Sequence, residues 1–207
     1  MKSLQILGIV GFAAAMTGCV PDWARENGTN LLMVVADITG SPGATGQTDG
    51  DILFSDVSQW INDDAIVTLS LFRKNPAVAT STPLEDVRLD SYQVRYLRSD
   101  GHNVEGVDVP FRITGPLNST LLHAPGNIGE ATGLVTINVV RHTAKREAPL
   151  INLIGILPTA TRSLSLPGQG IITTTAEITV FGRQVTTGEP LSATGRFQVV
   201  FADFADE

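Results

Sequence analysis

Apolar and polar residues alternate along much of the chain after residue 30, with the period of two that is typical of β-strands. In the last such segment Phe197, Val199 and Phe201 fall on one face, and we expect that face to be buried. The segments are rich in Thr, Val and Ile, whose stiff β-branched side chains favour a pleated surface. The pattern predicts strands at 31–38, 64–73, 87–97, 107–114, 133–141, 170–182 and 193–202.

Turn-forming residues separate these segments. Asp100-Gly101 follows 87–97, and Thr187-Gly188-Glu189-Pro190 predicts a hairpin between the last two strands. The stretch 41–51 is rich in Gly, Thr and Asp and predicts a loop. We find no amphipathic helix after residue 30, although 56–62 or 148–157 has room for one or two helical turns. Short strands without crossover helices predict an all-β fold, an antiparallel β-sandwich spanning residues 31–207.

Two short motifs resemble elements of known sandwich families. The spacing Leu89-x-x-Tyr92-x-Val94-x-Tyr96, followed by Asp100-Gly101, resembles the third strand of fibronectin type III domains. The segment 64–76, which ends in Asn75-Pro76, is similar to the strand-then-Asn-Pro element of water-stress sandwich domains. These resemblances imply an immunoglobulin-like architecture and say nothing about activity, because a sandwich hosts many unrelated functions.

The first residues break the alternation. Lys2 precedes a continuous apolar stretch from Leu4 to Met16, which is too short to span a bilayer and has the length of a signal-peptide core. The small residues Thr17 and Gly18 follow, directly before Cys19. We therefore predict a cleaved signal peptide at residues 1–18.

The residues around Cys19 resemble the lipobox of bacterial lipoproteins, with Met16 where that family usually has Leu, Val or Ile. The resemblance implies that the thiol of Cys19 takes a diacylglycerol before cleavage and that the freed amine takes a further acyl chain. Two or more chains give stable membrane attachment, whereas one holds only marginally. Residues 19–30 then form a lipidated N-terminus and a short tether. Val20 stands where inner-membrane retention uses Asp, so the resemblance favours the outer membrane if the source is Gram-negative.

Composition and charge narrow the function classes. The chain of 207 residues is 43% hydrophobic and 17% charged, which is globular composition, and its formal net charge is −7. An acidic chain without a run of Lys or Arg repels phosphate backbones, so we expect no nucleic-acid partner. Cys19 is the single cysteine, which excludes an intramolecular disulfide framework.

Catalytic motifs are weak. The three histidines, His102, His123 and His142, are far apart in sequence and lack the HExxH spacing of zinc enzymes. Ser99-Asp100-Gly101-His102 contains three triad residue types, but neighbours on a tight turn cannot form a relay, so we interpret it as a turn. No G-x-S-x-G elbow or phosphate-binding Gly loop is present. We therefore predict no catalytic residue and no cofactor.

Acidic and aromatic residues leave two binding alternatives open. Calcium could bind loop carboxylates, although Asp residues in Gly-rich turns also cap their own backbone. We expect most aromatic side chains to lie in the core, which leaves only Trp23 and Trp60 as exposed rings for a sugar. The carboxylates in question are Asp49, Asp51, Asp56, Asp63 and Asp64.

Two function classes follow. The favoured one is a lipid-anchored, non-catalytic binding or structural module of the cell envelope, with an envelope protein as its expected partner. The segment 107–111 contains Pro110, which suits an edge strand that faces such a partner, unless the proline simply ends the strand. The alternative is an envelope-polymer hydrolase or a calcium-dependent binding domain.

Overall fold

The computed structural model describes residues 30–41, 48–49, 52–74, 85–118, 120–125, 130–154 and 170–204. The predicted signal peptide, Cys19 and all of the tether except Asn30 lie outside the described residues. No helix within these ranges is long and apolar enough to cross a membrane.

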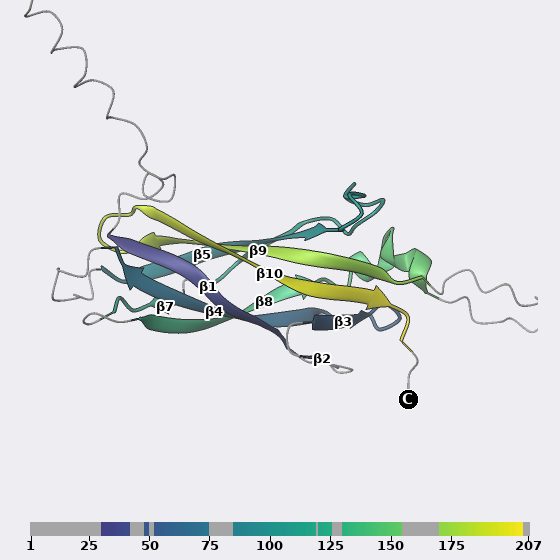
Figure 1. Ribbon diagram of the computed structural model, residues 1–207, viewed down its shortest axis with the longest axis horizontal. Coiled ribbons are helices and arrows are strands. Elements are labelled where there is room, and N and C mark those ends of the chain that lie inside the picture. Colours follow the sequence, from purple (N-terminus) through teal and green to yellow (C-terminus); the bar gives the residue numbers. More distant parts are fainter. Residues whose placement is uncertain are drawn as a thin grey trace, which may run out of the picture.

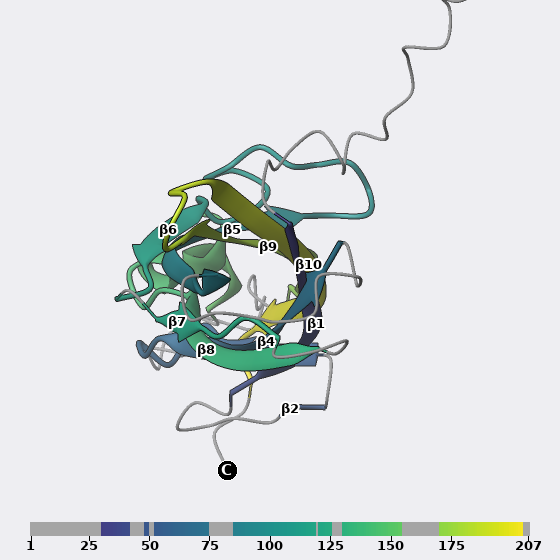
Figure 2. The same ribbon diagram turned by 90° about the vertical axis from the view of Figure 1, so that its left-hand side faces the viewer.

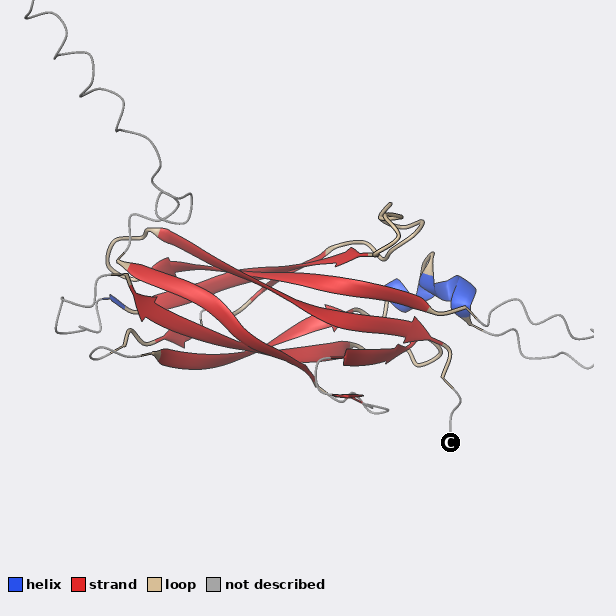
Figure 3. Cartoon of the chain, viewed as in Figure 1, coloured by secondary structure: helices blue, strands red, loops and turns tan. Residues whose placement is uncertain are grey.

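Strands form almost all of the regular structure, in two sheets (Figures 1 and 3). The smaller sheet has the order β1 (Leu31–Gly40), β4 (Asp63–Arg73) and β8 (Ala131–Val140). The larger sheet has the order β2 (Thr48–Asp49), β3 (Ile52–Asp56), β10 (Pro190–Ala202), β9 (Ile172–Gln184), β5 (Val87–Leu97) and β6 (Ile113–Pro116), and β7 (Leu121–Leu122) also pairs with β5. The 3-10 turns η2 (Ala144–Arg146) and η3 (Leu150–Leu153) follow β8.

The core lies between the sheets, which face each other in the end-on view of Figure 2. Inward residues such as Val67 on β4, Ile178 on β9 and Val199 on β10 are fully buried. The two sheets are in contact where β1 passes β10. A Cβ on Gly195 would lie 2.6 Å from Cγ1 of Val35, so glycine permits this close crossing.

The alternation pattern located most strands correctly. The predicted segments 31–38, 64–73, 87–97, 133–141, 170–182 and 193–202 correspond to β1, β4, β5, β8, β9 and β10. The hairpin between β9 and β10 is confirmed, with its turn at 185–189. The predicted buried face of the closing strand is also confirmed, because Phe197, Val199 and Phe201 are all buried.

The prediction of a purely antiparallel sandwich is wrong at β3. This strand was not predicted, and it pairs in parallel with β10, Leu53 opposite Val199. Its five residues are too few to show a clear period, and its partner lies at the other end of the sequence. The helical turn considered for 56–62 is absent. Asp56 instead accepts hydrogen bonds from the amide and the hydroxyl of Ser58, an Asx turn.

The strand predicted at 107–114 is also wrong for most of its length, since only its last two residues belong to β6. Gly106 has a positive φ of 77°, and its amide donates to the carbonyl of Val109, so the chain turns where the alternation suggested a strand. Pro110 is buried in this turn region, and 107–111 is not the edge strand that the sequence predicted. Within 41–51 the described pair Thr48–Asp49 forms β2, and η3 confirms a helical turn within 148–157.

Candidate functional site

The three histidines lie in separate polar contacts. His102 is exposed beside Asp100, with 3.5 Å between its Nδ1 and Oδ2 of the carboxylate. Nδ1 of His123 lies 2.9 Å from Oδ2 of Asp86, and Nδ1 of His142 lies 3.0 Å from Oδ1 of Asn62. In the described part of the chain, no three His, Cys, Asp or Glu side chains are placed to share a metal ion.

The Ser99–His102 motif forms a turn, as predicted. The carboxylate of Asp100 accepts a hydrogen bond from the backbone amide of His102 and pairs with the guanidinium of Arg98. The hydrogen bonds from Arg98 hold the pKa of Asp100 down at about 2. The carboxylate thus stabilises the turn and is not aligned with Ser99 in a relay.

The acidic residues considered for calcium have protein partners where the structure describes them. Asp56 accepts from the backbone amide of Ser58, as above, and the side-chain amide of Asn138 donates to Oδ1 of Asp64. Asp63 is paired with Lys145 inside the domain. Asp51 and the side chain of Asp49 lie outside the described part of the structure.

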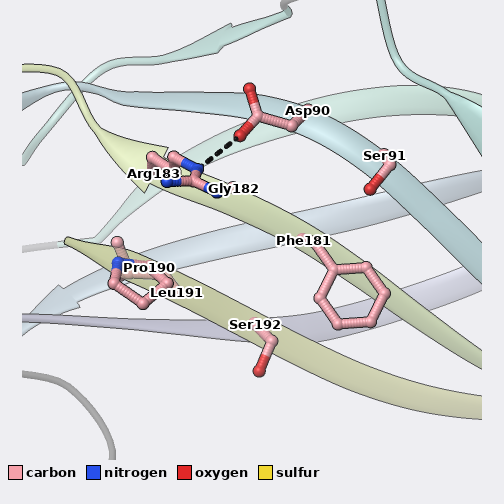
Figure 4. A pocket seen from close by; sticks show the side chains of 8 residues that line it. All are labelled: Asp90, Ser91, Phe181, Gly182, Arg183, Pro190, Leu191 and Ser192. Carbon is pink, nitrogen blue, oxygen red and sulfur yellow. Dashed lines mark ion pairs between the residues drawn. The ribbon is translucent and has the colours of Figure 1, made fainter. Parts of the chain in front are cut away.

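A hollow of about 500 Å³ opens on the outer face of the larger sheet (Figure 4). Three neighbouring strands form it, and its lining residues on β9 and β10 lie close to the turn of the β9–β10 hairpin. Figure 1 shows this hairpin turn at one end of the domain. Its lining residues are Asp90 and Ser91 from β5, Phe181, Gly182 and Arg183 from β9, and Pro190, Leu191 and Ser192 from β10.

A β-bulge in β5 shapes this hollow. The register between β5 and β9 shifts between Leu89 and Ser91, so Asp90 is an extra residue in the ladder. Gly182 lies opposite the bulge, and a Cβ there would come within 2.8 Å of the carbonyl oxygen of Arg88. The strands can therefore approach at this point because residue 182 is glycine, and the bulge brings the side chains of Asp90 and Ser91 together beside β9.

The carboxylate of Asp90 lies between two arginines. Its Oδ1 is 3.1 Å from Nε of Arg88, and its Oδ2 is 3.3 Å from Nε of Arg183, the contact drawn in Figure 4. Both arginine side chains are more than half exposed, so each pair contributes at most about 1 kcal/mol to stability. These charged groups therefore contribute little to stability, and they remain within reach of a ligand.

Phe181 supplies the apolar surface of the hollow, with 39% of the residue exposed. The expectation that aromatic residues on strands lie in the core is wrong for this one. Ala176, Ile178 and Val180 point inward on β9, so the period of two sends Phe181 outward. The same count along 176–182 in the sequence would have identified it.

The two tryptophans expected to be exposed have different outcomes. Trp60 is exposed as expected, and the guanidinium of Arg146 lies 4.1 Å from the centre of its ring, a cation–π contact. Trp23 lies outside the described residues. Trp60 precedes β4 and is not among the residues that line the hollow.

No family model and no curated protein matches the sequence. Its function is therefore inferred from its own residues.

Proposed function

We propose that this protein is a lipid-anchored, non-catalytic binding module of the cell envelope that holds a hydroxyl-rich ligand, an envelope glycan, on the outer face of β5, β9 and β10. The observation that carries this proposal is the exposed ring of Phe181, which lines one hollow together with the side chains of Asp90, Arg183, Ser91 and Ser192. An apolar surface with a few convergent polar groups is the usual composition of a small-ligand site.

The chemistry of these side chains suits a sugar. The C–H face of a pyranose ring packs well on an aromatic ring such as Phe181. Sugar hydroxyls both donate and accept hydrogen bonds, which matches a carboxylate, a guanidinium and serine hydroxyls. The outer face continues beyond the hollow with polar side chains, and the hydroxyls of Thr179 and Thr194 lie 3.0 Å apart on it. A chain of several sugar units could therefore extend along the sheet.

The presence of a single carboxylate in the lining of the hollow favours binding over hydrolysis. Glycoside hydrolysis generally needs two carboxyl groups on either side of the scissile bond, one as acid and one as base or nucleophile. Asp90 is the single carboxylate among the eight lining residues, and it is paired with arginines. This favours the binding module over the envelope-polymer hydrolase.

The anchor is proposed from the N-terminal sequence. Removal of residues 1–18 and acylation of Cys19 would leave a tether of about a dozen residues, with a reach of roughly 20 Å if it is flexible. This would hold the module within a few nanometres of the bilayer, at the outer membrane if the source is Gram-negative. The acidic chain has no basic run to attract anionic lipid, so attachment would depend on the acyl chains.

We also infer that the sandwich is immunoglobulin-like. In that fold the strands A, B and E share one sheet and G, F and C share the other. Taken in chain order, β1, β4 and β8 correspond to A, B and E, and β10, β9 and β5 to G, F and C. Strand C then carries the buried Tyr96, whose ring packs edge-on against Phe201 of β10 at 5.8 Å. This correspondence agrees with the resemblance of 89–101 to the third fibronectin strand.

The test is a binding measurement with glycans extracted from the envelope of the producing cells. The full chain in detergent should bind one of these polymers reversibly and leave its length unchanged. Phe181→Ala should weaken binding about tenfold or more, as loss of a central aromatic contact does. The matched control is Phe111→Ala, which removes another exposed ring that lies outside the hollow.

Three results would contradict the proposal. Absence of binding to any envelope glycan would remove its basis. Equal affinity for the unaltered protein and Phe181→Ala would place the ligand elsewhere. Release of shortened glycan by the purified protein would show that it is a hydrolase.

A further inference from the structure

The outer edge of β8 faces away from the rest of the smaller sheet. β8 is the last strand in the order β1-β4-β8, so its ladder with β4 occupies one edge only. The backbone amide of Asn138 donates to the hydroxyl of Tyr92 on β5, which shows that it points away from β4. Alternate residues of a strand direct their N–H and C=O groups to the same side. The backbone N–H and C=O groups of Thr136, Leu134 and Thr132 therefore also point away from β4.

From Ala131 to Asn138 this edge has none of the devices that usually prevent strand pairing, because the bulge in β8, at Val139, lies beyond this stretch. Sheet edges are commonly protected by charged residues, proline or bulges. β8 reads Ala-Thr-Gly-Leu-Val-Thr-Ile-Asn-Val-Val and has no charge and no proline. By contrast, β6 ends in Pro116, and β1 carries the exposed Asp37. Leu134 is 67% exposed in the middle of β8, an apolar side chain in water beside backbone groups that no described strand pairs.

No described strand takes the place next to β8. An immunoglobulin-like sheet continues from strand E to a strand D, but the described residues between β6 and β8 form only β7, which pairs with β5 in the other sheet. Leu122 of β7 packs under Gly133, where a Cβ would lie 2.1 Å from its Cδ2, so β7 closes the core from the inner side. β6 and β7 approach β8 from the larger sheet, but no described strand is paired with its edge from Thr132 to Thr136.

We propose that two copies of this chain associate through antiparallel pairing of their β8 edges, which joins the two smaller sheets into one six-stranded sheet. β8 is complementary to itself. With the two-fold axis at Leu134, this residue lies opposite Leu134 of the second copy, and Thr132 lies opposite Thr136 of the second copy. Directly opposed side chains point to the same face, so the two leucines cover each other and the threonines pair.

The charge of the chain favours this edge for self-association. Each copy has a net charge of −7, so two copies repel each other, and this repulsion is smallest where the contact surface itself holds no acidic groups. The ten residues of β8 meet this condition. Each opposed pair of outward residues exchanges two backbone hydrogen bonds, and the two-fold symmetry closes the assembly at two copies.

The test is site-specific photocrosslinking of the full chain in the producing cells. A photoreactive amino acid replaces Thr132, and two copies with different tags are produced together. The expected product is an adduct that carries both tags. Leu134→Lys places two like charges opposite each other at the axis and should reduce this adduct about tenfold or more. Its matched control is Ile66→Lys, which adds the same charge to the exposed face of the central strand and should leave the adduct unchanged.

A second pair of variants tests the backbone. Thr136→Pro removes an N–H that points away from β4, so it should abolish the adduct and keep the ladder with β4, whereas Thr136→Val keeps the N–H and the adduct. Circular dichroism shows whether each variant is folded. If Thr136→Pro is not folded, the adduct yield of Leu134→Lys is the measurement that tests the proposed pairing. The proposal is overturned if no doubly tagged adduct forms, if the adduct survives Leu134→Lys, or if residue 132 crosslinks instead to a different protein. These outcomes do not depend on glycan binding.

Discussion

Lys145 and Asp63 form an ion pair inside the domain, with 3.0 Å between Nζ and Oδ2. Their side chains are only 1% and 7% exposed. The hydroxyl of Ser55 donates to the same carboxylate oxygen at 2.6 Å. Burial raises the pKa of Asp63, while the charge of Lys145 and the hydrogen bond from Ser55 act in the opposite direction. The pair attaches η2 to the first residue of β4 and joins segments that are far apart in the sequence.

Loss of this lysine should destabilise the fold. Lys145→Met leaves a buried carboxylate without its partner, which should lower the free energy of unfolding by about 3–5 kcal/mol at neutral pH. The matched control is Arg112→Met, which breaks the more exposed pair with Glu105 and should cost less than about 1 kcal/mol. Urea denaturation of both variants measures the difference.

The effect of Lys145→Met should also depend on pH. Without the lysine the pKa of Asp63 rises further above its unfolded value near 3.8, so the folded protein holds a proton that the unfolded chain releases. Stability conferred by that proton is lost as the pH rises through the folded pKa. The destabilisation should therefore be smaller at about pH 4.5 than at about pH 7.5, and an equal loss at both values would contradict a buried charge as its cause.

Phe197→Ala tests the buried face of β10. Phe197 is 5% exposed, so the truncation should cost about 3–5 kcal/mol through lost burial and the cavity left behind. Phe181→Ala, on the outer face of β9, makes the same change in a half-exposed side chain and should cost less than about 1 kcal/mol. Chemical denaturation of the two variants gives the comparison, and similar losses would mean that the two faces have been assigned incorrectly.

Gly182→Ala tests the bulge that shapes the hollow. The added methyl group would lie 2.8 Å from the carbonyl oxygen of Arg88, a backbone atom that cannot move without disturbing the ladder. We expect a loss of about 1–3 kcal/mol. Gly170→Ala is the control, because its nearest neighbour is the flexible end of Leu153 at 3.1 Å. A thermal melt that shows no difference between the two variants would mean that the strands do not require glycine at residue 182.

Cys19→Ser tests the lipid anchor. Serine has no thiol for transfer of the diacylglycerol, so the variant should accumulate as an unprocessed precursor without lipid. Labelling of cells with a fatty-acid probe, followed by sequencing of the mature N-terminus, measures both effects. Unaltered protein that takes no label and begins at a residue other than Cys19 would show that the lipobox resemblance is misleading.

The sequence by itself determined where most strands lie and which face of them is buried. Phe197, Val199 and Phe201 point inward because a period of two is a local property of the backbone, readable from neighbouring residues. Cys19 and the signal peptide stay predictions from the sequence, since both lie outside the described residues.

Only the tertiary structure decided how the strands are paired. β3 lies in parallel beside β10, and Asp63 meets Lys145 where the sequence suggested a calcium ligand or a turn cap. The hollow needs both the bulge at Asp90 and the glycine at 182, which come from different strands. These contacts depend on which distant segments meet, and alternation in one strand contains no information about its partner.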